Sequence, residues 1–288
     1  MGIHWDVIQA STHPPTAYLL TAPVALLPWP ISSGIWAWMM HAATVASLRL
    51  YGMSWKWIPP TMVVLVAWPT FVHSLVQITA LWLLGTALAF HNRGRPVLAG
   101  ACIAFASLTK FLLGILLIHF VMRRQWRAIF GFLAVWSVSL LVVYVLSPQA
   151  IERYVEVNQA TTPNTIARLD NGAMIPSLAR LWGWPGAACA LAILAFITWR
   201  GRAEWHTWEF LAVALLPIAW IYSLLPLLSG LGARKGLLVL LVIFMTAFAP
   251  CFGPSSAIVL LSTQMTYAIG LLIAAAALPL SRAIPIDG

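Results

Sequence analysis

The chain has 288 residues, of which 61% are hydrophobic and 8% are charged, and its formal net charge is +9. Soluble domains carry roughly 25% charged residues, so this composition excludes an ordinary soluble globule and leaves most of the surface to face lipid. The positive charge does not indicate nucleic acid as a partner, because basic residues in such a chain mark cytoplasmic loops. We therefore predict an all-α, polytopic integral membrane protein whose surface contacts membrane lipids.

Apolar runs follow one another along the chain and predict its helices. Backbone N–H and C=O groups must be satisfied internally in lipid, so helices are the only element expected, and each full crossing needs about 20 residues. The runs lie at about 31–48, 61–90, 97–121, 128–146, 186–199, 208–233, 236–249 and 255–280. Together they predict a helical bundle that forms a single transmembrane domain over residues 1–288.

Basic residues cluster between these runs and constrain how the chain crosses the membrane. The clusters are Arg49 and Lys56; Arg93 and Arg95; Arg123, Arg124 and Arg127; Arg200 and Arg202; Arg234 and Lys235; and Arg282. If each run crossed once, successive clusters would alternate sides, against the positive-inside rule. We predict instead that residues 58–91, 97–121 and 208–233 are pairs of short helices that turn near the outer face. Broken helices of this kind imply a polar cavity that opens on the outer side.

Two segments are predicted to lie on the outer face. Residues 1–29 lack the basic n-region of a signal peptide, and we expect "PPTAYLLTAPVALLP" to form a helix in the outer interface. Residues 147–185 are predicted to form a long polar outer loop, in which three acidic and three basic residues cancel. Loops of this length in a compact protein are usually functional.

No metal site is predicted. Cys102, Cys189 and Cys251 lie in or beside apolar runs without a CxxC pattern, and the seven histidines form no HExxH or comparable pattern. We expect neither a bound metal nor a cofactor.

Several stretches, taken in order, resemble a known family. They are "HPPTAYLLTAPVALLPWPISSGIWAWMM", "VHSLVQITALWLL", "RGRPVLAGACIAFASLTKFLLGILLIHFVMRRQWRA" with its central lysine, "SPQAIERYVEV", "NGAMIPSLARLWGW" and "LPIAWIYSLLPLL". Their order and spacing, over nearly the whole chain, resemble the GT-C type polyprenol-phosphate-mannose-dependent glycosyltransferases of glycosyltransferase family 87. Three features depart from the family pattern: His13 replaces a Tyr, Val76 replaces a Gly, and the proline usual shortly after the lysine is absent from "KFLLGILL".

The resemblance also implies a region that this sequence lacks. Members of the family begin with an additional membrane span, followed by an outer loop with an Asp that is the expected catalytic base. Here the sequence starts within the predicted outer segment, residues 1–29. We therefore expect the first membrane span to be missing from this chain.

The resemblance implies a multi-pass transferase of the cell membrane. It would move a hexose, mannose in this family, from a polyprenyl-phosphate donor to a lipid or glycan acceptor on the extracytoplasmic face. Such chemistry needs a carboxylate to take the proton of the acceptor hydroxyl and cationic groups to stabilise the departing phosphate. Two alternatives stay open: a transporter or flippase for a lipid-linked or small solute, and an inactive truncated relative.

Two candidate residues follow directly from this chemistry. Asp6 is the only carboxylate before the first predicted span and is the candidate base. Its alternative is a solvated acid near a chain end. Lys110 is the candidate for the donor phosphate, because a lysine at the middle of a span costs about 2.5–3.5 kcal/mol and is usually functional. Its alternative is snorkelling to the interface without a ligand.

Further candidates for substrate binding are Gln77, His13, Tyr18, Arg168, Asn171 and Arg180. The two arginines are suited to phosphate or sugar through forked hydrogen bonds, and the asparagine is suited to sugar hydroxyls. Each has a structural alternative: loop contacts for the residues after 147, a helix partner for Gln77 and interface anchoring for Tyr18. Glu152, Glu156 and Asp170 are alternative candidates for the base.

Overall fold

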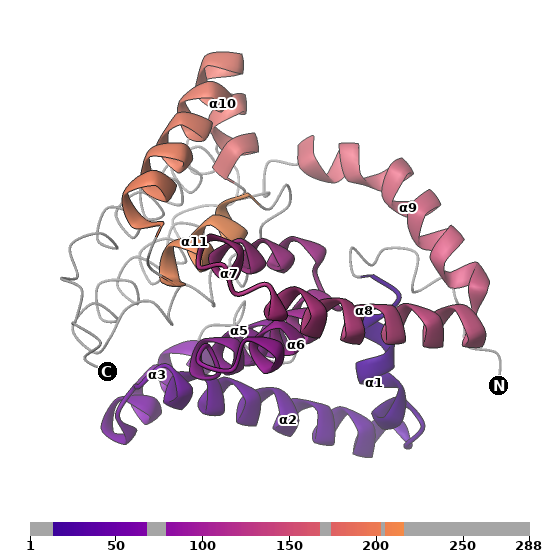
Figure 1. Ribbon diagram of the computed structural model, residues 1–288. Helices are drawn as coiled ribbons and strands as arrows, with labels where there is room; N and C mark the ends of the chain where they lie inside the picture. The colour runs from indigo at the N-terminus through magenta and orange to yellow at the C-terminus, as the bar shows by residue number, and fades with distance from the viewer. Residues whose placement is uncertain (1–13, 68–78, 168–173, 203–204, 216–288) are drawn as a thin grey trace. The chain divides into compact units, whose positions relative to one another are not determined.

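The structure is a computed structural model, and it describes residues 14–67, 79–167, 174–202 and 205–215 (Figure 1). Every regular element in these ranges is a helix, so the predicted all-α fold is confirmed. The chain divides into two compact units, Met1–Arg168 and Leu169–Gly288. A single transmembrane domain over the whole chain stays a prediction.

The helices have the following bounds. In the first unit they are α1 (Ala17–Ala25), α2 (Trp29–Leu50), α3 (Ile58–Ala67), α5 (Thr79–His91), α6 (Pro96–Ser107), α7 (Leu117–Met122), α8 (Arg127–Leu146) and α9 (Pro148–Ala167), with the short 3-10 helices η2 (Trp55–Trp57) and η3 (Phe111–Leu116). In the second unit they are α10 (Met174–Gly201) and α11 (Trp205–Ala214). Prolines occupy the first turns of α2 and α6, where a missing N–H breaks no intrahelical bond.

Four helices form the centre of the first unit. α5 lies beside α6, and α2 packs on α5 while α8 packs on α6 (Figure 1). A Cβ atom added at Gly100 of α6 would overlap the carbonyl oxygen of Ala128, and one at Gly131 of α8 would overlap the carbonyl oxygen of Val97. Each glycine therefore lets the backbone of the other helix approach closely, as small residues do in membrane helix pairs.

The run at 97–121 folds back on itself, as predicted. α6 ends at Ser107, the chain turns around Lys110, and η3 and α7 then return along α6. Trp136 Nε1, in the tenth of the 20 residues of α8, donates a hydrogen bond of 2.7 Å to Ser107 Oγ. The turn therefore lies beside the middle of α8, deeper than the outer-face position expected. The 12 residues of α6 rise only about 18 Å, which explains this depth.

The other two predicted helix pairs are described only in part. Residues 58–91 contain two short helices, α3 and α5, as expected, but their connection at 68–78 lies outside the described residues. Residues 208–233 begin within α11, and the remainder from 216 onward lies outside the described residues.

One helix is clearly suited to a membrane span. Within the described ranges, α8 alone is both long and apolar enough to cross a membrane; the shorter apolar helices are Ala80–His91, Pro96–Ser107, Phe111–Met122 and Trp182–Phe196. On α8, Phe130 is 70% exposed and Val145 is 71% exposed. Large apolar side chains exposed along a whole helix require an apolar environment around it.

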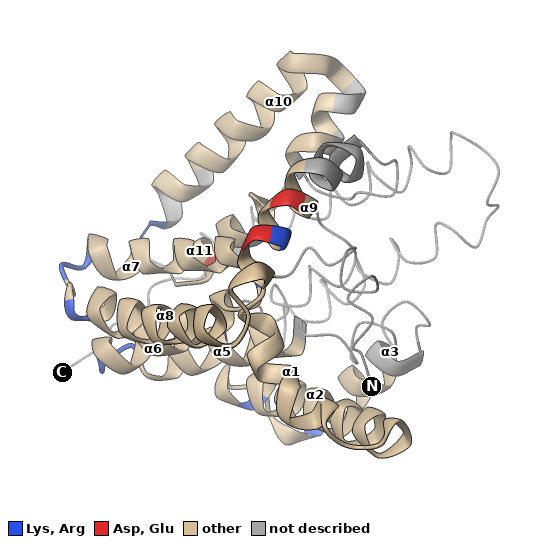
Figure 2. Cartoon of the chain, turned by 90° about the vertical axis from the view of Figure 1, so that its right-hand side faces the viewer, with Lys and Arg blue, Asp and Glu red and all other residues tan. Residues whose placement is uncertain are grey.

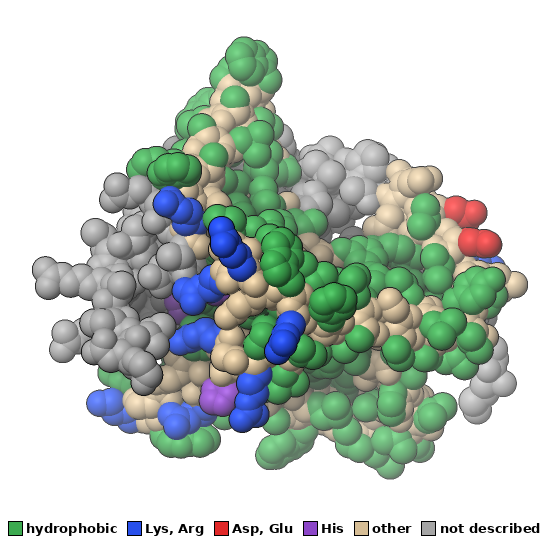
Figure 3. All heavy atoms as spheres, in the orientation of Figure 1, with side chains coloured by type: hydrophobic (Ala, Val, Ile, Leu, Met, Phe, Trp, Pro, Cys, Tyr) green, Lys and Arg blue, Asp and Glu red, His purple; other side chains and the backbone are tan. Residues whose placement is uncertain are grey.

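Most of the described basic residues of the first unit gather at one end of its helices, whereas Lys110 lies in the turn after α6 and Arg153 lies on α9. Figure 2 shows them at the ends of the helices, with acidic side chains on α9 away from them, and in Figure 3 they form a group on the surface. They are Arg49, Lys56, Arg93, Arg95, Arg123, Arg124 and Arg127. Clusters that are separate along the sequence thus come together in space, as the predicted fold-back requires.

The N-terminal segment is packed more deeply than an interfacial helix requires. Pro14, Pro15, Thr16 and Ala17 are buried, whereas Leu26 at the other end of α1 is 88% exposed. The start of α1 belongs to an apolar cluster made of Ala17, Met40, Ala43, Ala80 and Leu81. The small side chain of Ala17 allows this contact with α2 and α5. An outer-face location for residues 1–29 stays a prediction.

The polar stretch at 147–185 is largely helical, which differs from the predicted loop. α9 occupies its first half, and α10 begins at Met174. α10 bends at Gly183, which adopts a positive φ of 65° that favours glycine, shortly before Pro185. The sequence of α9 contains Glu, Gln and Ala, which favour a helix, so its polar composition suits a helix as well as a solvated loop. Polarity therefore indicated exposure correctly but not the local structure.

Candidate functional site

The site is built around residues 107–111, called here the Lys110 turn. α6 ends at Ser107, Leu108 caps it, and Lys110 adopts an extended conformation with φ −156° and ψ 109° before η3 begins at Phe111. Helix ends expose backbone carbonyl groups that need partners from elsewhere. The partners of this turn come from several elements that are distant in the sequence.

Lys110 packs against an aromatic ring. Its Nζ lies 5.2 Å from the ring centroid of Trp82 on α5, a cation–π distance. No ion pair joins Lys110 to a carboxylate of the described residues. The ring stabilises the ammonium group but carries no negative charge that would neutralise it.

α1 holds one side of the Lys110 turn. Thr16 Oγ1 donates a hydrogen bond of 2.7 Å to the carbonyl oxygen of Leu108, although 92 positions separate the two residues. Thr16 is also the residue that caps α1, but its hydroxyl makes no capping bond to α1. The hydroxyl instead satisfies a carbonyl at the end of α6. Both residues are buried, so water does not compete for this bond.

α8 also contacts the turn. Ser107 Oγ accepts the hydrogen bond from Trp136 Nε1 and donates one of 2.9 Å to the carbonyl oxygen of Ala104. The ring of Trp136 also lies 5.0 Å from the ring of Phe111, measured between centroids. The same tryptophan therefore contacts the residues at both ends of the turn.

α9 reaches back to the turn through one tyrosine. The ring of Tyr154 lies 6.0 Å from that of Phe111 in an edge-to-face arrangement. The pKa of the Tyr154 phenol is raised, first by burial and second by the neighbouring phenol of Tyr18 on α1. Both effects disfavour the charged phenolate, so this phenol is neutral at physiological pH.

The acidic residues of α9 point away from the turn. Glu152 and Glu156 are exposed and lie four residues apart, on one face of the helix. Tyr154 lies two residues from each, about 200° around the helix axis, and it faces Phe111. In this structure neither glutamate is oriented to act on a substrate at Lys110.

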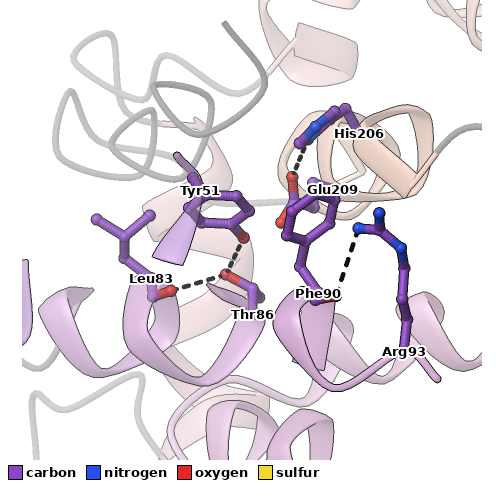
Figure 4. A network of polar contacts seen from close by, with 7 residues as sticks. All are labelled: Tyr51, Leu83, Thr86, Phe90, Arg93, His206 and Glu209. Carbon is purple, nitrogen blue, oxygen red and sulfur yellow. Dashed lines mark hydrogen bonds and ion pairs between the residues drawn. The ribbon is translucent and has the colours of Figure 1, made fainter. Parts of the chain in front are cut away.

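Other polar contacts support the helices and not the turn (Figure 4). The Tyr51 hydroxyl donates a hydrogen bond of 3.0 Å to Thr86 Oγ1, and Thr86 donates one of 3.1 Å to the carbonyl oxygen of Leu83. These bonds join the end of α2 to α5. In the second unit, His206 Nδ1 lies 2.8 Å from Glu209 Oε2 (Figure 4). The described residues contain no group of three potential metal ligands.

The structure describes two of the predicted site residues in full. Lys110 lies in the turn and Tyr18 lies in the first turn of α1, next to Tyr154, so both belong to elements that meet there. Arg180 lies in α10, and its side chain lies outside the described residues. The remaining predicted residues, Asp6, His13, Gln77, Arg168 and Asn171, also lie outside the described residues.

Four residues that contact the turn are not among the predicted site residues: Thr16, Trp82, Trp136 and Tyr154. For Thr16 a signal was present, because a threonine after two prolines at a helix start suggests a specific hydrogen-bonding role. The aromatic residues gave no such signal, since tryptophan and tyrosine are common throughout membrane helices and at their ends.

Comparison with known proteins identifies one family. The model of glycosyltransferase family 87 matches residues 12–225, which include α1, the Lys110 turn and α9. Neither the curated proteins nor the solved structures contain a match to this chain.

Proposed function

This chain belongs to glycosyltransferase family 87, and we propose that it transfers a hexose, mannose in the first instance, from a polyprenyl-phosphate donor to a lipid or glycan acceptor. The observation that carries this proposal is Lys110, a cation without a described carboxylate partner, in a turn beside the middle of an apolar helix. A charge at this depth is unfavourable unless it has an anionic partner or its side chain can reach out of the apolar region. The family match favours the transferase over the transporter alternative.

In the proposed reaction, the acceptor hydroxyl attacks the anomeric carbon of the donor sugar from the face opposite the phosphate. The new carbon–oxygen bond forms as the bond to the phosphate breaks, and polyprenyl phosphate leaves with an additional negative charge. The ammonium group of Lys110 stabilises that charge as it develops. The configuration at the anomeric carbon is inverted.

A carboxylate takes the proton of the acceptor hydroxyl, and we assign this role to Asp6. The orientation of Glu152 and Glu156 away from the turn supports this choice among the acids before residue 168. Arg168, Arg180, Asn171, Gln77 and His13 remain proposed contacts to the sugar or phosphate, and Tyr18 is proposed to contact the substrate beside Tyr154.

We further propose that the protein is a multi-pass protein of the cell membrane. The end of the first unit that carries the arginines would face the cytoplasm, and the end that carries the acids of α9 would face outward. The Lys110 turn would then accept the donor from within the bilayer, where its isoprenoid chain lies.

The test is transfer from a labelled donor. Membranes that contain the protein are incubated with radiolabelled polyprenyl-phosphate mannose, and the labelled products are separated by chromatography. Lys110→Gln should lower the transfer rate at least about tenfold, because the departing phosphate loses its cation. Asp6→Asn should lower it as well.

Lys56→Gln is the matched control, because Lys56 is an exposed lysine on the basic end and far from the turn in sequence. Its rate should equal that of the wild type. Equal rates for Lys110→Gln and the wild type would remove Lys110 from the site, and a wild-type protein without transfer would contradict the proposed donor.

A further inference from the structure

We propose that Thr16 is a positioning residue for Lys110, which acts by holding the Lys110 turn in place. This inference rests on the proposed function, because Lys110 is the group whose position would matter. Thr16 does not itself contact the substrate in this proposal. It acts through the carbonyl oxygen of Leu108, two residues before the lysine.

The hydrogen bond has the properties of a positioning contact. It is 2.7 Å long and joins a side chain on α1 to the backbone of α6, across 92 positions of the chain. Thr16 is 0% exposed and Leu108 is 4% exposed, so the carbonyl group has no water to replace the hydroxyl. The next residue, Thr109, uses its own hydroxyl for the carbonyl of Ala106 at 2.7 Å. Among the described residues, Thr16 is the side chain that donates a hydrogen bond to the backbone of Leu108.

The start of α1 is built to present this hydroxyl. The N–H groups of the first turn of α1 already have backbone acceptors, so this turn makes little demand for a capping hydroxyl. The carbonyls of Pro14 and Pro15 accept hydrogen bonds from the N–H groups of Ala17 and Tyr18, at 2.9 and 3.1 Å, which fixes the backbone around Thr16. The hydroxyl of Thr16 is thus directed to another helix at a fixed position.

The carbonyl of Leu108 needs a partner from outside α6. Trp136 contacts Ser107 and Phe111, but neither contact involves this carbonyl, and no backbone N–H of the described residues bonds it. Without Thr16, the segment between Leu108 and Phe111 would lose its hydrogen bond to α1. The ammonium group of Lys110 would then occupy a wider range of positions.

The first measurement is independent of activity. Hydrogen–deuterium exchange of the purified full chain should rise in the peptide that covers residues 107–113 when Thr16→Val or Thr16→Ala removes the hydroxyl. Thr16→Ser keeps the hydroxyl and should exchange like the wild type. Thr21→Val is the matched control, because Thr21 lies on the same helix and its hydroxyl, among the described residues, bonds the nearby carbonyl of Tyr18 at 3.1 Å. Unchanged exchange in both Thr16→Val and Thr16→Ala would overturn the proposal.

The second measurement asks whether Thr16 acts through Lys110. Thr16→Val should lower kcat/KM for polyprenyl-phosphate mannose about fivefold to tenfold, the effect of one buried hydrogen bond, and Thr16→Ser should restore it. In a Lys110→Gln background, the same substitution should lower kcat/KM by less than about twofold, since the lysine that it positions is absent. An equal loss in both backgrounds would overturn the positioning role, as would a loss in Thr16→Ser as large as that in Thr16→Val.

The two proposals fail in different ways. A wild-type chain that transfers no sugar would contradict the proposed function and, with it, any action of Thr16 on a donor phosphate. A wild-type chain that transfers sugar, while Thr16→Val behaves as the wild type in both measurements, would contradict this inference alone.

Discussion

Ser107 takes part in two hydrogen bonds at the end of α6, one accepted from Trp136 and one donated to the carbonyl of Ala104. Its side chain is 0% exposed. In such an environment each bond is stronger than in water, and an unsatisfied donor is more costly. The indole N–H of Trp136 therefore depends on this serine for an acceptor.

Replacing Ser107 should destabilise the protein through that donor. Ser107→Ala leaves the indole N–H without its acceptor and should lower the free energy of unfolding by about 1–3 kcal/mol. The double variant Ser107→Ala with Trp136→Phe should lose little more hydrogen-bond energy than Ser107→Ala alone, because the indole donor is then absent too. Ser33→Ala is the control, since among the described residues Ser33 bonds the carbonyl of Pro30, and this bond is exposed.

Thermal unfolding in detergent, followed by circular dichroism, measures these differences. If Ser107→Ala and Ser33→Ala unfolded at the same temperature, the bond between α6 and α8 would have no measurable role.

At the scale of elements, the packing of α6 on α8 decides where the Lys110 turn lies. Gly100 and Gly131 let the two backbones approach, each against a carbonyl oxygen of the other helix. Close approach is what allows Trp136 to reach Ser107 and Phe111. The geometry of the site therefore depends on residues that have no chemical role.

A single methyl group should test this packing. Gly100→Ala adds a Cβ atom that overlaps the carbonyl oxygen of Ala128, so the helices must separate, at a cost of about 1–3 kcal/mol. Gly34→Ala on α2 meets no atom within 4 Å and should be neutral or stabilising by about 0.5–1 kcal/mol. The free energy of unfolding, obtained from denaturant titration in detergent, gives both values. A Gly100→Ala variant as stable as Gly34→Ala would show that α6 and α8 adapt without loss.

At the scale of the whole molecule, the arrangement of charge in the first unit predicts how it lies in a membrane. Basic residues precede α8, and the acids Glu152 and Glu156 follow it on α9. α8 separates these two groups and is long enough to cross the hydrocarbon layer. The positive-inside rule then assigns the basic end to the cytoplasm.

Labelling from outside the cell should confirm this orientation. In a variant without native cysteines, Glu152→Cys should react with a membrane-impermeant maleimide in intact cells. Arg124→Cys, on the exposed connection before α8, should react only after the cells are opened. The opposite labelling pattern would show that the basic end faces outward. It would then contradict both the proposed orientation and transfer on the extracytoplasmic face.

Much of the fold was accessible from local patterns. Apolar runs predicted helices, and the basic clusters predicted that residues 97–121 turn back at Lys110, because each basic cluster restricts the side on which a connection can lie. The depth of the turn was not accessible, since it depends on how far α6 extends along α8. The helical state of 147–167 was missed because polarity alone does not separate an exposed helix from a loop.

The amino-acid pattern was enough to predict the helical class, the fold-back of 97–121, the isolation of Lys110 in an apolar run and the resemblance to a family that the chain indeed belongs to. The side chains around the Lys110 turn became known from the packed helices alone: Trp82 from α5, Thr16 from α1, Trp136 from α8 and Tyr154 from α9. The reason is that hydrophobicity and charge act residue by residue along the chain. Contacts across 92 positions exist only after separate helices have packed.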